Sequence, residues 1–270
     1  MAEKLNKLEG GTWLQYSFSI WRDAQKNQEE WKLKHPAMFP IKLAERLIEI
    51  YTNKPNQIIL DPFMGSGSVL IAAQAMKMKG VGFEISKEYC DMAKKRLEET
   101  YKSMFSENNY KIYCDSSLNI KKHLEPNSVD LTITSPPYWD ILNRKRTADR
   151  KEIQNYGDSK QDFGNIPDYE NFLLSLQNVF KEVYDVTKSG RYCIVVVMDI
   201  RKGPKLYQLH SDLTRKMEEI GFTLNDIIIW DRQKEYNNMR PLGYPYSFII
   251  NKVHEYILIF KKNNIIDKEK

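Results

Sequence analysis

Short apolar runs alternate with amphipathic stretches along most of the chain, and this alternation predicts the order of its secondary structure. Runs rich in apolar and β-branched residues that end at a polar or glycine-containing turn are typical of buried strands. From about residue 57 onward the sequence has seven such runs, at 57–60, 81–83, 110–113, 129–134, 192–198, 227–230 and 255–260. We therefore expect seven strands.

Helical periodicity fills the intervals between these runs. The strongest pattern begins at Asp168, directly after Pro167, and has apolar residues at 3.6-residue spacing from Tyr169 to Val183. Further helices are predicted after residue 40, over 69–78, over 86–101 and over 206–220. Strands that alternate with helices form sheets covered on both faces. The pattern predicts an α/β fold, with one doubly wound domain around a mostly parallel, seven-stranded sheet.

Two polar stretches, 139–165 and 231–252, are too long for tight connections in a compact domain, and loops of this length are usually functional or disordered. Together with 199–205 they contain five more basic than acidic residues, which equals the net charge of +5 for the whole chain. A basic rim on an otherwise neutral protein is typical of phosphate contact, although a solvated surface has the same composition. The charge therefore favours nucleic acid as the partner.

The composition of the 270 residues is that of a soluble globular protein. No apolar run approaches the roughly 20 residues that span a bilayer, and the first residues lack the apolar core of a signal peptide. We therefore expect a cytoplasmic protein without a membrane partner. Cys90, Cys114 and Cys193 are far apart in the sequence and have no metal-ligand spacing. We expect buried, reduced thiols and no metal.

Candidate chemistry begins at the glycine-rich turn after the first predicted strand, where open α/β sheets bind their ligands. Gly65 and Gly67 allow the backbone to approach a bound molecule closely. Glu84 ends the next strand, where an acidic side chain can bind ribose hydroxyls, and Asp115 ends the third strand, within reach of an adenine amine. Position 70 is Leu, so the third glycine of a dinucleotide site is missing. These residues indicate a nucleoside cofactor without a diphosphate, such as S-adenosylmethionine.

At the same turn, Asp61-Pro62-Phe63-Met64-Gly65-Ser66-Gly67-Ser68 resembles the cofactor motif of the DNA amino-methyltransferases, the N4-cytosine and N6-adenine enzymes. Ser135-Pro136-Pro137-Tyr138 resembles the catalytic motif of that family, and His35-Pro36-Ala37-Met38-Phe39-Pro40 resembles its segment that closes over the methionine end of the cofactor. The resemblance implies a Rossmann-like methyltransferase fold and S-adenosyl-L-methionine as cofactor. The residues expected to bind the cofactor are therefore His35, Pro36, Asp61, Pro62, Phe63, Gly65, Gly67 and Ser68 from these segments, with Glu84 and Asp115 from the strand ends as independent support.

The resemblance also divides the chain into regions. The methyltransferase domain is expected over 35–262, as a cofactor half (35–125) followed by a catalytic half (126–262). An N-terminal arm (1–34) precedes it and a tail (263–270) follows it. Many relatives have the two halves in the reverse order, and such a permutation moves the termini without disturbing the site.

An exocyclic base amine is a poor nucleophile because its lone pair is delocalised into the ring, so it needs hydrogen-bond acceptors while it attacks the methyl group. Prolines have no N–H and hold neighbouring carbonyls in a fixed direction. The resemblance assigns the Ser135 hydroxyl and the Pro136 carbonyl as acceptors, followed by Pro137, and Tyr138 as the ring that stacks on a base flipped out of the duplex. Ser at position 135 favours the N4 amine of cytosine, with the N6 amine of adenine as the alternative.

Basic side chains in the two long loops are candidates for DNA binding: Arg144, Lys145, Arg146 and Arg240. They could contact phosphates or read guanine, or they could only solvate exposed loops. Trp139 could line the base pocket or pack in the core. We expect double-stranded DNA as partner and, with it, a possible cognate restriction endonuclease. The alternatives are a methyltransferase that acts on RNA or protein, and a catalytically silent DNA-recognition subunit.

Overall fold

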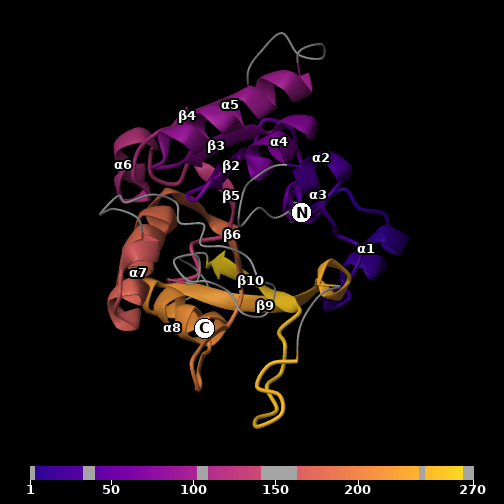
Figure 1. Ribbon diagram of the computed structural model, residues 1–270. Helices are drawn as coiled ribbons and strands as arrows, with labels where there is room; N and C mark the ends of the chain where they lie inside the picture. Colours follow the sequence, from indigo (N-terminus) through magenta and orange to yellow (C-terminus); the bar gives the residue numbers. More distant parts are fainter. Residues whose placement is uncertain (1–3, 33–39, 102–108, 141–162, 237–240, 264–270) are drawn as a thin grey trace.

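The computed structural model describes residues 4–32, 40–101, 109–140, 163–236 and 241–263 (Figure 1). These residues are arranged around an eight-stranded sheet with the strand order β1-β9-β10-β6-β5-β2-β3-β4. Within the described residues, no helix is long and apolar enough to cross a membrane.

The seven predicted strands are all present, as β2 (Ile58–Asp61), β3 (Lys79–Phe83), β4 (Tyr110–Tyr113), β5 (Val129–Thr134), β6 (Thr187–Val197), β9 (Phe222–Asp231) and β10 (His254–Lys262). An eighth strand, β1 (Ile20–Trp21), pairs in parallel with β9 at one edge. The predicted number was one too low because a two-residue strand has no hydrophobic period.

A hairpin corrects a second expectation. β7 (Ile200–Lys202) pairs with β8 (Lys205–Tyr207), and the helix predicted from residue 206 begins at Leu209 instead. The apolar residue at position 206 fits either period, and the Gly-Pro turn at 203–204 selects the hairpin.

Strand direction decides which edge of the sheet can hold a site. β2 pairs in parallel with β3 and β5, β3 with β4, and β5 with β6. β10 is antiparallel to both β6 and β9, so β9 runs in the same direction as β6. The carboxyl ends of β2 to β6 and of β9 therefore meet at one edge, which we call the carboxyl edge. Ligands of open α/β sheets bind at this edge.

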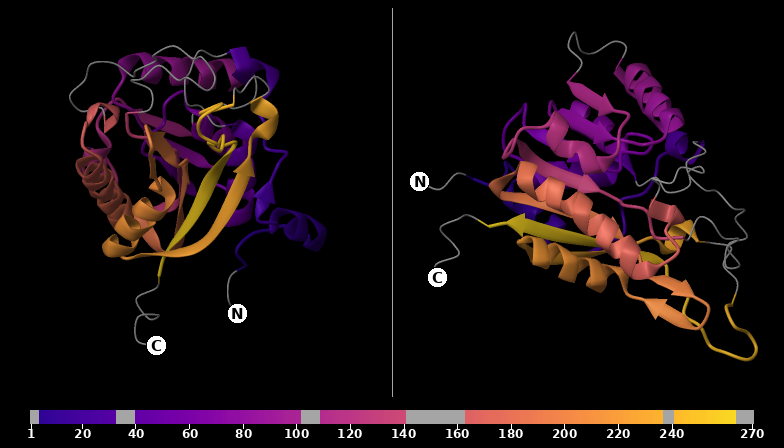
Figure 2. Two further views of the ribbon diagram at one scale, coloured as in Figure 1. Left: turned by 60° about the horizontal axis from the view of Figure 1, so that its bottom comes forward. Right: turned by 90° about the vertical axis from the view of Figure 1, so that its left-hand side faces the viewer.

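Helices cover both faces of the sheet (Figures 1 and 2). One face holds α3 (Ile41–Tyr51), α4 (Ser68–Ala75) and α5 (Lys87–Tyr101), and the other holds α6 (Ile120–His123), α7 (Tyr169–Val186) and α8 (Leu209–Ile220). Successive residues of β6 alternate between the two cores: Ile194 and Val196 pack under the first set of helices, and Val195 under the second. This double burial explains why the central strands are continuous apolar runs.

The N-terminal arm includes α1 (Gly10–Tyr16) and α2 (Gln28–Lys32) and packs beside α3 and β9. Trp21 is buried, and Trp230 Nε1 donates a hydrogen bond of 3.0 Å to the Ala24 carbonyl. The Arg46 guanidinium of α3 lies over the rings of Tyr16 and Trp21. The arm is therefore attached to the edge of the sheet by the β1–β9 pairing, by the Trp230 hydrogen bond and by the Arg46 cation–π contacts. Short 3₁₀ turns elsewhere are η1 (Ser117–Asn119), η3 (Phe163–Asn165) and η4 (Gln233–Glu235).

The cysteines partly follow the expectation. Cys90 and Cys193 are buried free thiols, whereas the free thiol of Cys114 is exposed. The prediction was wrong for Cys114 because this residue follows the last residue of β4, Tyr113, and so lies at the carboxyl edge rather than within the sheet.

Candidate active site

The turn between β2 and α4 needs small residues because the backbone is bent and crowded there. Gly65 and Gly67 have φ of 51° and 83°, the left-handed region that glycine enters without steric cost. A Cβ on Gly67 would lie 3.0 Å from the Cβ of Ala93 in α5. The Met64 N–H donates to the Phe83 carbonyl over 2.9 Å, which attaches the turn to β3. The predicted glycine positions are therefore required by the local geometry.

Glu84, at the end of β3, holds the same turn. Its Oε2 accepts from the Gly65 N–H at 2.9 Å and its Oε1 accepts from the Ser86 N–H at 2.8 Å. Each carboxylate oxygen has a second lone pair, so the group can also accept from a bound hydroxyl. The structure thus brings Glu84 to the glycine-rich turn, as the sequence predicted.

Asp115, after β4, has partners that the sequence analysis missed. Its Oδ1 accepts from the Asn119 side chain at 2.8 Å, and its Oδ2 lies 2.9 Å from His123 Nε2. These contacts, that with His123 first, lower the pKa of the Asp115 carboxyl. The His123 ring also packs on Tyr113, 4.3 Å between centroids. An ionised, half-buried acid therefore stands at the carboxyl edge beside Glu84.

Asp61 joins the glycine-rich turn to the Ser-Pro-Pro-Tyr motif. Its side chain is buried, and Oδ1 accepts from the Phe63 N–H at 3.1 Å and from the Thr134 hydroxyl at 2.7 Å. Thr134 is the last residue of β5, directly before the motif. Burial raises the pKa of the Asp61 carboxyl to about 7, although the two hydrogen bonds lower it. One hydrogen-bonded acid thus connects the two candidate motifs.

A nucleoside cofactor fits the residues around the turn. Ser68 Oγ, at the start of α4, is buried and has no hydrogen-bond partner among the described residues. It directly follows Gly67 in the glycine-rich turn. Pro62 and Phe63 lie at the start of the same turn, and Phe63 packs on Phe163 at 6.0 Å between centroids. The predicted contacts His35 and Pro36 lie outside the described residues.

The Ser-Pro-Pro-Tyr motif leaves β5 at the carboxyl edge and is held by side chains. Ser135 Oγ lies 2.9 Å from the Tyr138 hydroxyl, which also donates to Glu255 Oε2 at 2.9 Å. Pro136 is buried and Pro137 half-buried. Burial, followed by the charge of Glu255, raises the pKa of Tyr138 well above its usual value.

Glu255 and its partner Arg232 are site residues that the sequence analysis missed. Glu255 is only 4% exposed, in β10, and forms an ion pair with Arg232 just after β9. Arg232 also binds Glu235 at 2.6 Å and lies over the Trp230 ring. The one available signal was an acidic residue at the start of an otherwise apolar run, and a buried acid of this kind requires a charged partner.

Trp139, directly after the motif, packs in the core. It is 3% exposed, and its Nε1 donates to the Ile166 carbonyl at 2.8 Å. Its ring contacts those of Tyr169 and Tyr207, and Lys202 Nζ lies 3.7 Å from its centroid. Of the two interpretations, base pocket or core, the structure supports the core.

The candidate DNA-binding residues Arg144, Lys145, Arg146 and Arg240 lie outside the described residues. Two described segments project from the carboxyl edge, the β7–β8 hairpin and the loop 241–250 (Figures 1 and 2). The loop exposes aromatic side chains to an unusual degree: Tyr244 78%, Tyr246 93% and Phe248 94%. The hairpin has the exposed basic residues Arg201 and Lys205.

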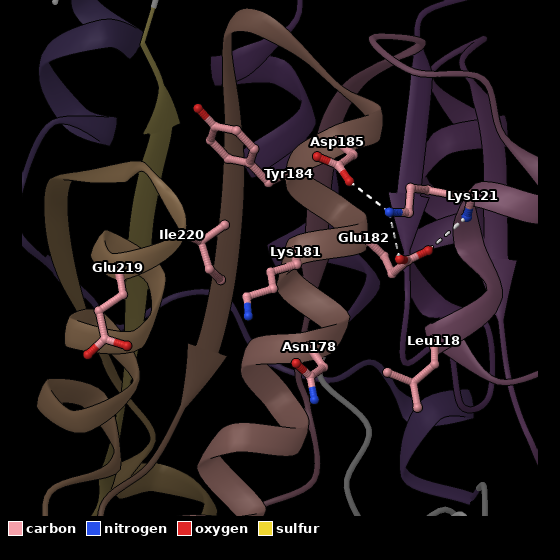
Figure 3. A pocket seen from close by; sticks show the side chains of 9 residues that line it. All are labelled: Leu118, Lys121, Asn178, Lys181, Glu182, Tyr184, Asp185, Glu219 and Ile220. Atoms are coloured by element: carbon pink, nitrogen blue, oxygen red, sulfur yellow. Dashed lines mark hydrogen bonds and ion pairs between the residues drawn. The ribbon is translucent and has the colours of Figure 1, made fainter.

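A surface groove elsewhere on the protein is separate from this site. Figure 3 shows it along the outer side of α7, lined by Leu118, Lys121, Asn178, Lys181, Glu182, Tyr184, Asp185, Glu219 and Ile220. Lys121 Nζ binds Asp185 at 2.9 Å and Glu182 at 3.1 Å. None of the predicted site residues lines the groove, so the candidate chemistry lies at the carboxyl edge instead.

Solved structures of known proteins share this fold. Over most of the chain, the fold resembles TrmN from Thermus thermophilus, with a TM-score of 0.54 at 12% identity over 84% of this chain and 50% of that one. It also resembles a SAM-dependent O-methyltransferase from Thermotoga maritima, with a TM-score of 0.51 at 14% identity over 87% and 70%. At these identities the likeness shows the fold alone, that of the Rossmann-like methyltransferases.

Sequence relatives are more specific. The orphan methyltransferase M.BamHII of Bacillus amyloliquefaciens is 45% identical over 85 residues, 30% of this chain and 32% of that protein. The type II methyltransferase M2.DpnII of Streptococcus pneumoniae is 41% identical over 73 residues, 27% of each. The matched segments thus cover about a third or less of these relatives. The model of a family described as DNA methylase, the N6 and N4 methyltransferases, matches residues 2–95 and 129–269. The chain therefore belongs to the N6/N4 DNA methylase family, and its cofactor is S-adenosylmethionine.

Proposed function

We propose that this protein methylates the N4 amine of cytosine in double-stranded DNA. The observation that carries the proposal is the Asp61–Thr134 hydrogen bond, which brings the end of β2 and the end of β5 together. A cofactor on the glycine-rich turn and a base at Ser135 would therefore face each other across the carboxyl edge. Serine at position 135 supports cytosine, and the N6 amine of adenine is the second candidate, because both amines are planar and need the same acceptors.

The residues of the motif have distinct parts in this reaction. Bound S-adenosylmethionine supplies a methyl group on a positively charged sulfur. The Ser135 hydroxyl and the Pro136 carbonyl accept hydrogen bonds from the two N–H groups of the amine, which favours the tetrahedral nitrogen that attacks. The nitrogen–carbon bond would form as the carbon–sulfur bond breaks, and the methylated amine would then release one proton to solvent. Tyr138 offers its ring to a base that has left the stack, since the amine cannot be reached inside a duplex. Positioning of this kind can lower a barrier by several kcal/mol.

Contacts with DNA are proposed for the two long loops of the sequence. Arg144, Lys145, Arg146 and Arg240 would neutralise phosphates, and the exposed rings of the loop 241–250 would contact bases or sugars. The intact motifs argue against a silent recognition subunit, and the basic excess in the sequence of 139–165, 199–205 and 231–252 argues for nucleic acid over a protein substrate. A restriction endonuclease that cuts the same sequence would be the partner in a restriction-modification system.

The test is incubation of the purified protein with labelled S-adenosylmethionine and unmethylated genomic DNA. We expect label in the DNA and N4-methylcytosine among the digested nucleosides. N6-methyladenine in its place would support the second candidate. A protein that binds the cofactor normally but labels RNA, or nothing, would contradict the proposal.

A further inference from the structure

A chain of hydrogen bonds runs from the catalytic serine to a buried ion pair. Ser135 Oγ and the Tyr138 hydroxyl lie 2.9 Å apart, and the Tyr138 hydroxyl lies 2.9 Å from Glu255 Oε2. Glu255 Oε1 accepts from Arg232, which completes the chain. Each hydrogen bond has one donor and one acceptor. If Glu255 can only accept, the donor and the acceptor of the other hydrogen bonds in the chain are also determined.

The ion pair fixes one end of this chain. Burial by itself would lower the pKa of Arg232, but the charges of Glu255 and Glu235 raise it above its usual value. Arg232 is therefore a permanent cation, and Glu255 is the carboxylate that forms an ion pair with it. An ionised carboxylate can only accept hydrogen bonds.

Direction then follows from counting protons. The Tyr138 hydroxyl has one proton and two neighbours that can only accept, Glu255 Oε2 at 2.9 Å and the Val196 carbonyl at 3.4 Å. The carboxylate is the nearer of the two and carries the charge, so it takes the Tyr138 proton, and this proton points away from Ser135. The Tyr138 oxygen can then only accept from Ser135, so the serine proton points to Tyr138. The high pKa of Tyr138, caused by burial and by Glu255, keeps this proton in place. Toward any further group, Ser135 Oγ can then only accept a hydrogen bond, through its lone pairs.

We propose that Glu255, with Arg232, is a positioning residue that makes Ser135 an obligate hydrogen-bond acceptor for the target amine. The inference rests on the proposed function, in which Ser135 accepts a hydrogen from the amine. Without the carboxylate, Tyr138 can donate to Ser135 instead, and the serine proton is free to turn toward the N–H of the base. Two donors would then face each other, and the amine would lose an acceptor.

Glu255→Gln tests the idea with almost no change of shape. The amide removes the charge and can donate to Tyr138, so the chain no longer has one direction. We expect kcat to fall about tenfold to a hundredfold, the effect of one misdirected hydrogen bond at a reacting group, with the Kd for S-adenosylmethionine unchanged. Glu235→Gln is the matched control: it removes the other carboxylate on Arg232 but does not touch Tyr138. It should leave kcat within about twofold, because Arg232 keeps its ion pair with Glu255 and the hydrogen bonds of Tyr138 are unchanged.

A double-mutant cycle separates this role from a structural one. Tyr138→Phe keeps the ring and removes the hydroxyl through which Glu255 would act. If the inference is right, Glu255→Gln has little further effect in the Tyr138→Phe background. If the two losses in kcat multiply in full in the double variant, the inference is wrong. If the Gln variant does not fold, Glu255→Asp keeps the charge beside Arg232 and withdraws the acceptor by one methylene, and the same cycle applies.

A readout that needs no substrate keeps the inference distinct from the proposed function. In the free protein, the Tyr138 hydroxyl proton should be slow to exchange and shifted downfield in the NMR spectrum, and Glu255→Gln should abolish this signal. Its persistence in Glu255→Gln would contradict the inference whether or not DNA is methylated. Failure of the proposed function would appear differently, as wild-type protein that transfers no label to DNA.

Discussion

The turn after β2 and the motif after β5 lie at the same edge of the sheet, but different contacts hold them. The turn is fixed by glycine backbone geometry and by Glu84, whose oxygens bind N–H groups 19 and 2 residues away in sequence. The motif is fixed by side chains, and Tyr138 reaches Glu255 across 117 residues. The contacts of the turn are thus with residues nearer in sequence, whereas the shape of the motif depends on the last strand of the sheet.

Because different contacts hold the two regions, we expect substitutions in them to change different properties of the protein. Changes in the turn should alter stability and cofactor affinity, because they strain the backbone on which we propose that the cofactor binds. Changes in the motif should alter the rate of transfer and leave both quantities nearly intact. Asp61 is the exception, since it contacts both regions, and variants of it should mix the two kinds of effect.

The largest effect is expected for Tyr138→Ala, which removes both the ring and the anchoring hydroxyl. Stacking on a base is worth about 1–3 kcal/mol, and lost positioning of Ser135 adds to it. We expect kcat/KM for DNA to fall about a thousandfold, with the Kd for S-adenosylmethionine unchanged within about twofold. Steady-state kinetics and calorimetry measure the two quantities. A parallel loss of cofactor affinity would show that the motif and the turn do not affect separate properties.

Asp61 should produce the next largest effect, on stability as a function of pH. Its pKa is raised to about 7 in the folded protein, from 3.8, so the folded state binds more protons between these values. The unfolding free energy should therefore fall as pH rises from about 4 to 7, by up to a few kcal/mol. Asp61→Asn keeps an oxygen that accepts from Thr134 and Phe63 but has no charge to bury.

Denaturant unfolding at a series of pH values measures this effect. In Asp61→Asn, the unfolding free energy should no longer fall between pH 4 and 7, and the variant should be more stable than the wild type at pH 8. Asp130 is the matched control, because it is a buried acid whose pKa is lowered, by the Lys188 hydrogen bond against burial. Asp130→Asn should leave the decline in place. An unchanged pH profile in Asp61→Asn would assign the decline to other groups.

The same contrast explains what could be predicted from sequence. The apolar period identified seven strands, and the end of the second of them placed Glu84 at the carboxyl edge, since both depend mainly on neighbours in the chain. The roles of Glu255 and Arg232 were missed because they arise where β9 and β10 meet the end of β5. The position of Trp139 remained open for the same reason: its partners Ile166 and Tyr207 lie far along the chain.

A smaller effect is expected for Gly67→Ala, in the turn. A left-handed φ of 83° costs a non-glycine residue about 1 kcal/mol or more, and the new Cβ would meet Ala93 at 3.0 Å. We expect a loss of roughly 2 kcal/mol in unfolding free energy, with weaker cofactor binding. Gly203→Ala, at φ 60° with no atom within 4 Å, isolates the backbone cost. Equal losses in the two variants would show that crowding against α5 contributes nothing.

The smallest effect is expected in a third region, the loop 241–250, which contributes neither to the core nor to the cofactor site. Phe248 is 94% exposed, so Phe248→Ala should change the unfolding free energy by less than about 0.5 kcal/mol. If its ring contacts DNA, the Kd for duplex DNA should rise about threefold to tenfold, while the Kd for the cofactor stays constant. Phe18, 58% exposed in the N-terminal arm, gives the matched control Phe18→Ala, which should leave DNA affinity unchanged. Fluorescence anisotropy with labelled duplex DNA measures both, and equal losses for both variants would indicate nonspecific contact of exposed rings rather than a DNA surface at the carboxyl edge.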